Sequence, residues 1–493
     1  MKSKTQKGSA LIFALIFLLV LSVMGASMMF LSQSETWSGM NYKMMTQTRY
    51  GAEAGVHAAA NYLMYTYTPP ASTAGFNTAV YPVTTTAGSN VILSSLSGVS
   101  ATYPNSSVRS AFVNATNSSS AGTTLYAGSG SGAVPVNYTA SAQLMAMAQI
   151  TPFSSTTPIM IQTWQITAHG DITGVKNAES EVSAVLERQV SPTFAFAAFA
   201  TAGGCGALSF TGNGGTDSYD SGSLTLNANG SASSSPTFQN YGGNVGTNGN
   251  QDDSGNNVQI YGSLSTPRTG VGNCTAGNVT AFTGKSTTQI SGGIIELPQA
   301  INLPNPTIPA PGVTNVNNTA TLCPTSAPAV GSCTAGEYGD ISISGNNVVT
   351  LVPGTYNINS ISISGNAVLQ LGPDPVTGLY GPVVINVTGS GNSNPINLSG
   401  NGISNPTYDS TMLQFSYAGT GTVNIVGNGA SAAVIYAPNA TASFKGNGSF
   451  YGAVIANQVT DVGNGSIHYD RKLQRKLFTV GNYMLSSFTW SRF

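Results

Sequence analysis

The chain has very little charge. Only 7% of its 493 residues are charged, against about 25% in ordinary soluble domains, and the formal net charge is −1. Six cations lie between Gly51 and Asp470, namely Arg109, Lys176, Arg188, Arg268, Lys285 and Lys445. Because no basic tract is available to neutralise phosphates, we expect no nucleic-acid partner.

Histidine is equally scarce, which limits the catalytic chemistry available. The three histidines, His57, His169 and His468, lie in different predicted regions, so no nucleophile–histidine–acid set is expected. No phosphate-binding G-x-x-x-x-G-K-[ST] loop occurs either. The sequence therefore predicts a protein that is not an enzyme and holds no cofactor.

Cysteines are few but even in number. Their pattern lacks the C-x-x-C spacing and neighbouring histidine of a zinc site, so no metal is predicted. An even number in an exported region favours disulfides. Cys323 and Cys333 close a short loop and are the first choice of pair, which leaves Cys205 for Cys274. Sequence alone leaves the connectivity open.

One long uncharged run stands out against this background. Three lysines, Lys2, Lys4 and Lys7, precede an apolar segment from Ser9 to Ser34, which is long enough to cross a bilayer as a helix with its basic end in the cytoplasm. A secretory signal peptide has its small-residue cleavage site after the apolar region. Here the small-residue junction, Gly8/Ser9, lies before it, so the apolar segment would survive processing.

This order resembles the leader of type IV pilins and of type II secretion pseudopilins. PilX-type minor pilins are the better match, because the first 65 or so residues carry their motif residues: Gln6, Gly8, Ala10, Leu11, Glu35, Asn41, and the segment Ala52, Glu53, Ala54, Gly55. The resemblance implies cleavage after Gly8 by prepilin peptidase, methylation of Ser9, residence in the inner membrane, and assembly with other minor and major pilins. A plain uncleaved signal anchor is the alternative.

One position departs from the pattern of most pilins. The fifth mature residue would be Phe13, where most members have a glutamate that is thought to neutralise the amino terminus of a neighbouring subunit. A buried carboxylate is tolerable only when paired. The resemblance therefore implies a priming or tip position, which a type II secretion tip pseudopilin would share.

The chain divides into five predicted parts. After the leader (1–8), a helix (9–65) ends before Pro69-Pro70, and its small residues Gly51, Gly55 and Ala58–Ala60 would admit a neighbouring helix. Residues 66–194 are predicted to be a pilin-like α+β region, with long loops over 73–150 and strands at Thr163–Ile172 and Glu179–Val190. A β-rich head (195–470), interrupted by a proline-rich segment (297–312), precedes a basic tail (471–493), interpreted as a solvated cap.

A recurring apolar–polar alternation that ends in Gly-Asn marks the head. It is found at Leu208–Asn213, Ile341–Asn346, Ile361–Asn366, Ile396–Asn401, Val423–Asn428, Ala442–Asn447 and, more weakly, Thr460–Asn464. Short strands at such steps favour a right-handed β-helix-like solenoid, with a β-sandwich as the competitor. Stacked corners would place the asparagines in a hydrogen-bonded ladder. The predicted fold class is mainly β with a long N-terminal α-helix: a pilin-like helix and antiparallel sheet, then the solenoid.

Two further functions are weighed for the head. Its neutral surface, rich in hydroxyl and amide groups, suits adhesion to surface glycans. Gly215-Thr216-Asp217 and Gln251-Asp252-Asp253 resemble fragments of the β-helical polysaccharide hydrolases, but the G-H-G and R-I-K motifs of that family are missing. An irregular calcium site at Asp217–Asp220 or Asp252–Asp253 is the weakest hypothesis.

Overall fold

The computed structural model describes residues 9–126, 134–150, 152–153, 158–172, 177–324, 334–399, 402–427 and 431–492. The chain forms two compact units. Unit 1 contains residues 1–150, 158–190 and 480–493, and unit 2 contains residues 151–157 and 191–479. Unit 2 is thus inserted into the chain of unit 1.

Unit 1 is built on one long helix, α1 (Ser9–Asn61), followed by a short π-helix, Tyr62–Thr66. At 1.5 Å per residue α1 is roughly 80 Å long. The helix ends ahead of the Pro69-Pro70 pair, as predicted. Within the described residues it is the one helix long and apolar enough to cross a membrane, and its most apolar stretch has mean hydropathy 2.6 and is not buried in the protein.

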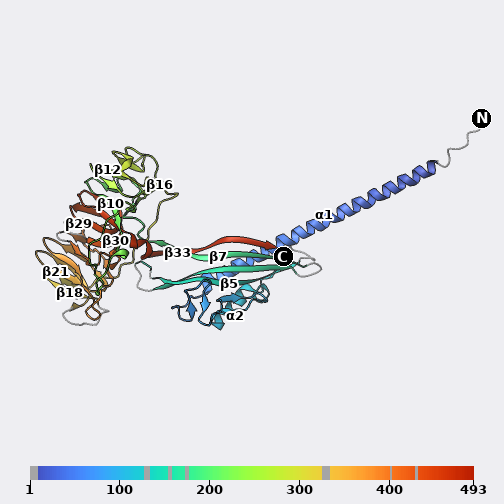
Figure 1. The fold of residues 1–493 in the computed structure, drawn as a ribbon, viewed down its shortest axis with the longest axis horizontal. Coiled ribbons are helices and arrows are strands. Elements are labelled where there is room, and N and C mark those ends of the chain that lie inside the picture. Colours follow the sequence, from blue (N-terminus) through green and yellow to red (C-terminus); the bar gives the residue numbers. More distant parts are fainter. Residues whose placement is uncertain are drawn as a thin grey trace, which may run out of the picture. The chain divides into compact units, whose positions relative to one another are not determined.

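The second half of α1 packs on an antiparallel sheet with the strand order β3-β5-β6-β7-β33 (Figure 1). The strands and helices of unit 1 are β1 (Phe76–Asn77), β2 (Thr84–Thr85), β3 (Ile92–Ser94), α2 (Ser106–Thr116), α3 (Ser118–Ala121), β4 (Leu125–Tyr126), β5 (Pro135–Ile150), β6 (Ile159–Ile172), β7 (Ala178–Pro192) and β33 (Phe478–Arg492). The strands β6 and β7 match the two that sequence alternation predicts, and they pair from Trp164↔Leu186 to Ile172↔Ala178.

Two predictions for this region were wrong. Residues 73–150 are not long loops alone, because they also contain β5, a 16-residue strand whose side chains alternate between half-buried and buried positions from Pro135 to Met145. Nor is the tail simply a cap over the head. After a short 3₁₀ helix, Arg471–Arg475, the chain forms β33 and joins the sheet of unit 1 beside β7. The sheet edge left by β7 is thereby paired, which removes an exposed row of backbone donors and acceptors.

Unit 2 consists of mostly short strands in parallel ladders (Figure 1). They are β8 (Ala198–Ala200), β9 (Leu208–Phe210), β10 (Gly215–Tyr219), β11 (Val245–Thr247), β12 (Gln251–Asp253), β13 (Gln259–Ile260), β14 (Leu264–Thr266), β15 (Phe282–Gly284), β16 (Ile294–Glu296), β17 (Thr314–Val316), β18 (Ala320–Cys323), β19 (Thr334–Ala335), β20 (Tyr338–Ile343), β21 (Val348–Leu351), β22 (Gly354–Ile358), β23 (Ser360–Ile363), β24 (Val368–Leu371), β25 (Val383–Val387), β26 (Ile396–Leu398), β27 (Ile403–Ser404), β28 (Leu413–Tyr417), β29 (Thr422–Gly427), β30 (Ser431–Gly446), β31 (Phe450–Asp461) and β32 (Ile467–Asp470). Short 3₁₀ turns lie at Ser221–Ser223, Thr287–Gln289 and Ser410–Met412.

The Gly-Asn repeats stack on one another in register. One ladder runs through Ile341, Ile361, Ile396, Val423, Ala442, Val459 and Leu208. Their inward side chains are fully buried and form part of one continuous apolar core. This burial explains why the same positions of each repeat are apolar.

Asparagines at the corners bond from one rung to the next. The Nδ2 of Asn366 donates to Asn346 Oδ1 at 3.2 Å, and the Nδ2 of Asn464 donates to Asn447 Oδ1 at 2.8 Å. Asn213 continues the second row with a 2.9 Å bond to Asn464. These bonds match the ladder that the repeated Gly-Asn pairs predict.

The rungs do not follow chain order. Residues 195–297 precede the proline-rich interruption of the predicted head, yet β8 and β9 pair with β31, the penultimate strand of the part that follows the interruption. Gly212 shows how close this junction is, since a Cβ there would lie 1.8 Å from the carbonyl oxygen of Gly463. The two parts therefore form one stack, and the chain enters and leaves it at adjacent rungs.

The proline-rich segment 297–312 crosses the stack instead of separating two domains. Near its start, Ile301 exchanges backbone bonds with the Asn248 side chain at 2.8 and 2.9 Å. The Tyr436 hydroxyl donates to the carbonyl of Pro304 at 2.6 Å. By β17 the chain has reached β20, at the opposite end of the ladder from β15. Proline suits this path because it lacks an amide donor that a strand would need.

The fold class is thus confirmed as a long N-terminal helix followed by a β-rich body.

Candidate functional site

The first candidate site is the N-terminal half of α1. The helix begins at Ser9, and Gly8 lies outside the described residues. The side chains described between Ala10 and Tyr42 are exposed, with Phe13 at 70%. Glu35 and Asn41 also lie on this uncovered stretch. An apolar surface of this length needs a bilayer or other helices to cover it.

The Ala52–Gly55 segment lies where α1 meets its own sheet. Ala52 is fully buried. Gly55 leaves room for Ala168, because a Cβ added at Gly55 would lie only 2.9 Å from the Cβ of Ala168. Glu53 stays near the surface and accepts a 2.9 Å hydrogen bond from Arg49 Nε. Ala54 is half-buried.

Small residues on α1 therefore act differently from the prediction. We expected Gly51 and Gly55 to admit a neighbouring helix, but both face β5 and β6 of the same chain. The opposing residue on β6 is also a glycine, Gly170, and a Cβ there would lie 2.1 Å from the Thr48 carbonyl oxygen. Glycines on both surfaces permit a close approach of helix to strand.

The second candidate site is a cluster of charges in unit 2, around Asp470. This carboxylate has no exposed surface and accepts five hydrogen bonds. Ser221 donates from its amide at 3.1 Å and its hydroxyl at 2.7 Å, and Ser410 donates likewise at 3.2 and 3.0 Å. The amide of Lys472 completes the set at 3.1 Å. Burial raises the pKa of Asp470, while the Ser221 bonds oppose that rise.

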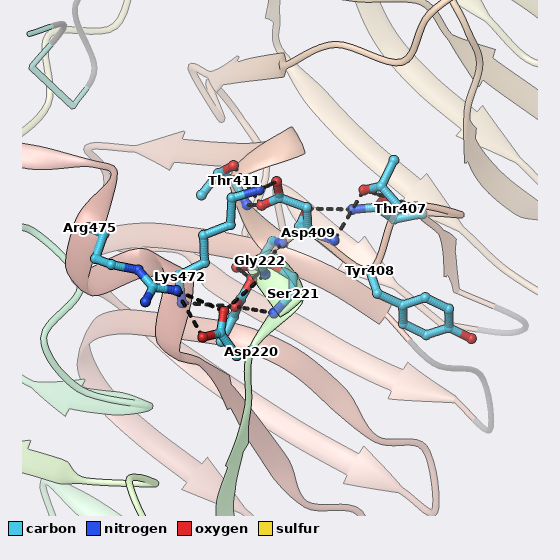
Figure 2. A network of polar contacts seen from close by, with 12 residues as sticks. Asp220, Ser221, Gly222, Thr407, Tyr408, Asp409, Thr411, Lys472 and Arg475 are labelled. Atoms are coloured by element: carbon cyan, nitrogen blue, oxygen red, sulfur yellow. Dashed lines mark hydrogen bonds and ion pairs between the residues drawn. The ribbon is translucent and has the colours of Figure 1, made fainter. Parts of the chain in front are cut away.

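Two further carboxylates hold the basic residues of the 3₁₀ turn (Figure 2). The Nζ of Lys472 binds Asp409, and Arg475 binds both oxygens of Asp220 at 2.9 and 2.8 Å. These contacts join segments separated by 63 and 255 residues. Sequence reasoning missed Asp409 and Asp470. A usable signal was that Asp409 is an isolated acid in a neutral region and that Asp470 directly precedes the basic residues Arg471 and Lys472.

The hydrolase fragments do not converge. Asp217 lies on β10, which pairs with β32 and β13, and it bonds to His468, whose ring stacks on Phe238 at 3.8 Å. Asp252 lies on β12, which pairs with β9 and β15. The neighbouring Asp253 is fully buried, and burial raises its pKa to about 7. The paired carboxylates that a glycosidase needs are thus on different ladders.

The structure also bears on metal binding and on the predicted disulfides. Among the described residues no group of three or more His, Cys, Asp or Glu side chains is arranged to hold a metal ion. Cys205 and Cys274 form a disulfide that closes a 69-residue separation. Cys323 is also disulfide-bonded, and Cys333 lies outside the described residues.

A membrane-length apolar helix that continues into a helix packed on an antiparallel sheet defines the pilin-like class of protein. Residues 7–57 match the family model described as PilX N-terminal, which is the family that the N-terminal motif residues resemble. Residues 329–476 match a second model, a domain of unknown function (DUF7305).

No curated protein matches the chain. Among solved structures, the competence-associated pilin ComZ from Thermus thermophilus is similar, with 14% identity, coverage of 91% of this chain and 98% of that chain, and a TM-score of 0.28.

Proposed function

We propose that this protein is a minor pilin that enters a type IV pilus through α1 and presents unit 2 as a β-solenoid head at or near the tip, where it serves adhesion. The exposed apolar stretch of α1 carries the proposal. It is long enough for the inner membrane before assembly, and other minor and major pilins would cover it afterwards.

Prepilin peptidase would cut between Gly8 and Ser9. Mass spectrometry of the purified mature protein tests this step. A first residue at Ser9 supports it, and an intact Met1 or a start beyond Leu31 refutes it.

The tip position rests on Phe13. Because residue 13 is a phenylalanine, this subunit has no carboxylate there to pair with the amino terminus of another subunit. A subunit at the first position of a filament does not need this pairing, so Phe13 fits that position. The parallel ladders and the in-register repeats favour the solenoid form of the head.

The insertion of unit 2 between β7 and β33 provides a clean test of adhesion. Because these strands are neighbours in the sheet, replacing residues 191–479 by a short Gly/Ser linker should leave unit 1 able to fold. We expect the number of pili to be unchanged and attachment to glycan-bearing surfaces to fall. Loss of pili would instead indicate a pure priming role, and impaired protein secretion with normal pili would indicate a type II secretion pseudopilin.

A further inference from the structure

Unit 2 contains a polar groove of about 240 Å³ next to the charge cluster. Asp220 and Arg471 line it together with a set of hydroxyl and amide side chains, including those of Ser223, Thr225, Ser234, Ser235, Thr237 and Gln239. Its volume lies below the roughly 300–1,000 Å³ of pockets for drug-sized ligands, which suits one or two sugar rings. Such a lining favours a ligand rich in hydroxyl groups.

The groove is held open by bonds between two loops distant in sequence. The loop between β10 and β11 is fixed to β10 by reciprocal backbone bonds of Ser218 and Gln239, at 3.2 and 2.8 Å. It is fixed to the loop before β28 by the Ser235 and Tyr408 hydroxyls, 3.2 Å apart. Tyr408 has φ 52°, a conformation that a bulky residue adopts only when its surroundings impose it. The site is therefore formed before any ligand arrives.

Charge pairing leaves one cation in the cluster unmatched. Asp217 pairs with His468, Asp409 with Lys472, and Asp220 with Arg475. Asp470 is satisfied by the hydroxyl and amide donors described above. No carboxylate of the described residues forms an ion pair with Arg471.

Arg471 is nevertheless held in a defined position. Its guanidinium lies 5.0 Å from the centre of the Tyr241 ring, and its Nη1 donates to the Tyr241 hydroxyl at 2.9 Å. Its Nε is buried without a hydrogen-bond partner. An oriented guanidinium that lines a polar groove and lacks an anion is suited to bind a carboxylate.

We propose that this groove binds a carboxylated sugar unit of a surface glycan, with Arg471 pairing with the sugar carboxylate and the Ser, Thr and Gln239 side chains bonding to its hydroxyls. The proposal deepens the adhesive role proposed above by naming the site and the ligand class. Uronic acids and sialic acids share this chemistry.

The test uses the full chain in detergent and matched pairs of glycans. Trigalacturonate is compared with its methyl ester, and sialyllactose with lactose, by isothermal titration and saturation-transfer NMR. We expect at least one acidic member to bind about tenfold or more tightly than its neutral match, and Arg471→Gln to remove that preference. The pair that shows the effect identifies the sugar class.

Lys476→Gln is the matched control, because it removes the same charge from an exposed residue that does not line the groove. It should bind like the parent chain, and circular dichroism should show both variants to be folded. Equal binding of acidic and neutral glycans, no binding of either acid, or an equal loss with both variants would overturn the proposal.

The two proposals fail separately. If the purified chain binds no acidic sugar while removal of unit 2 still abolishes attachment, the groove is wrong and the adhesive role stands. If Arg471→Gln abolishes sugar binding but pili attach normally, the groove is right and the adhesive role is wrong.

Discussion

Replacing Asp470 by alanine should strongly destabilise unit 2. The change removes a carboxylate that accepts five hydrogen bonds. The buried amides and hydroxyls of Ser221 and Ser410 would lose this acceptor. Buried donors that lose their partner cost about 1–3 kcal/mol each, and such losses in one network are not additive. We therefore expect the free energy of unfolding to fall by about 3–5 kcal/mol.

The assay is denaturant unfolding of the full chain in detergent, followed by far-UV circular dichroism. All three tryptophans, Trp37, Trp164 and Trp490, belong to unit 1, so their fluorescence reports on that unit separately. The loss should appear in the dichroism transition of the β-rich unit 2.

Asp220→Ala is the matched control. Asp220 pairs with Arg475, whose side chain is 62% exposed, and accepts the Gly222 amide at 2.9 Å, so its loss should cost about 1–2 kcal/mol. If Asp470→Ala costs no more than Asp220→Ala, Asp470 does not hold the three segments together and the reasoning is refuted.

Three other predictions concern pH, packing and filament position. Burial raises the pKa of Asp253 and of Asp461 to about 7, so the folded state keeps protons that the unfolded state releases above about pH 4. The free energy of unfolding should therefore fall between about pH 4 and 7 and then level off. Asp253→Asn should reduce that fall in urea titrations. A stability that rises over this range would contradict the burial argument. Gly170→Ala should cost at least about 1–3 kcal/mol in tryptophan-monitored unfolding because its Cβ meets the backbone of α1, whereas Gly39→Ala, with open space around it, should not destabilise. Phe13→Glu should allow the subunit to enter the filament below the tip, so immunogold label confined to pilus ends would count against the proposed role of this position.

Local sequence patterns predicted much of the fold. The uncharged run after the lysines predicts a helix of membrane length, because only apolar side chains are stable in a bilayer. The alternation in Thr163–Ile172 predicts a strand, and each Gly-Asn repeat marks the end of one rung. These signals act over a few residues and can be read one segment at a time.

Other features depend on contacts between distant segments. The pairing of β8 and β9 with β31, the return of β33 to the first sheet, and the path of the proline-rich segment leave no local pattern. The Arg471 groove likewise needs two loops brought together by the stack. The candidate site was therefore predicted only in part: the helix motif was found, and the charge cluster was not.

The sequence by itself determined that this chain has an apolar helix, the N-terminal motif residues of a PilX-type pilin, and a repetitive β-rich region. Only the tertiary structure decided the order of the rungs, which glycines face the chain's own sheet, and which carboxylate meets which base. The reason is physical: hydrophobic periodicity is a property of neighbouring residues, whereas strand-edge pairing and the satisfaction of buried charges are settled by whichever segments the folded chain places in contact.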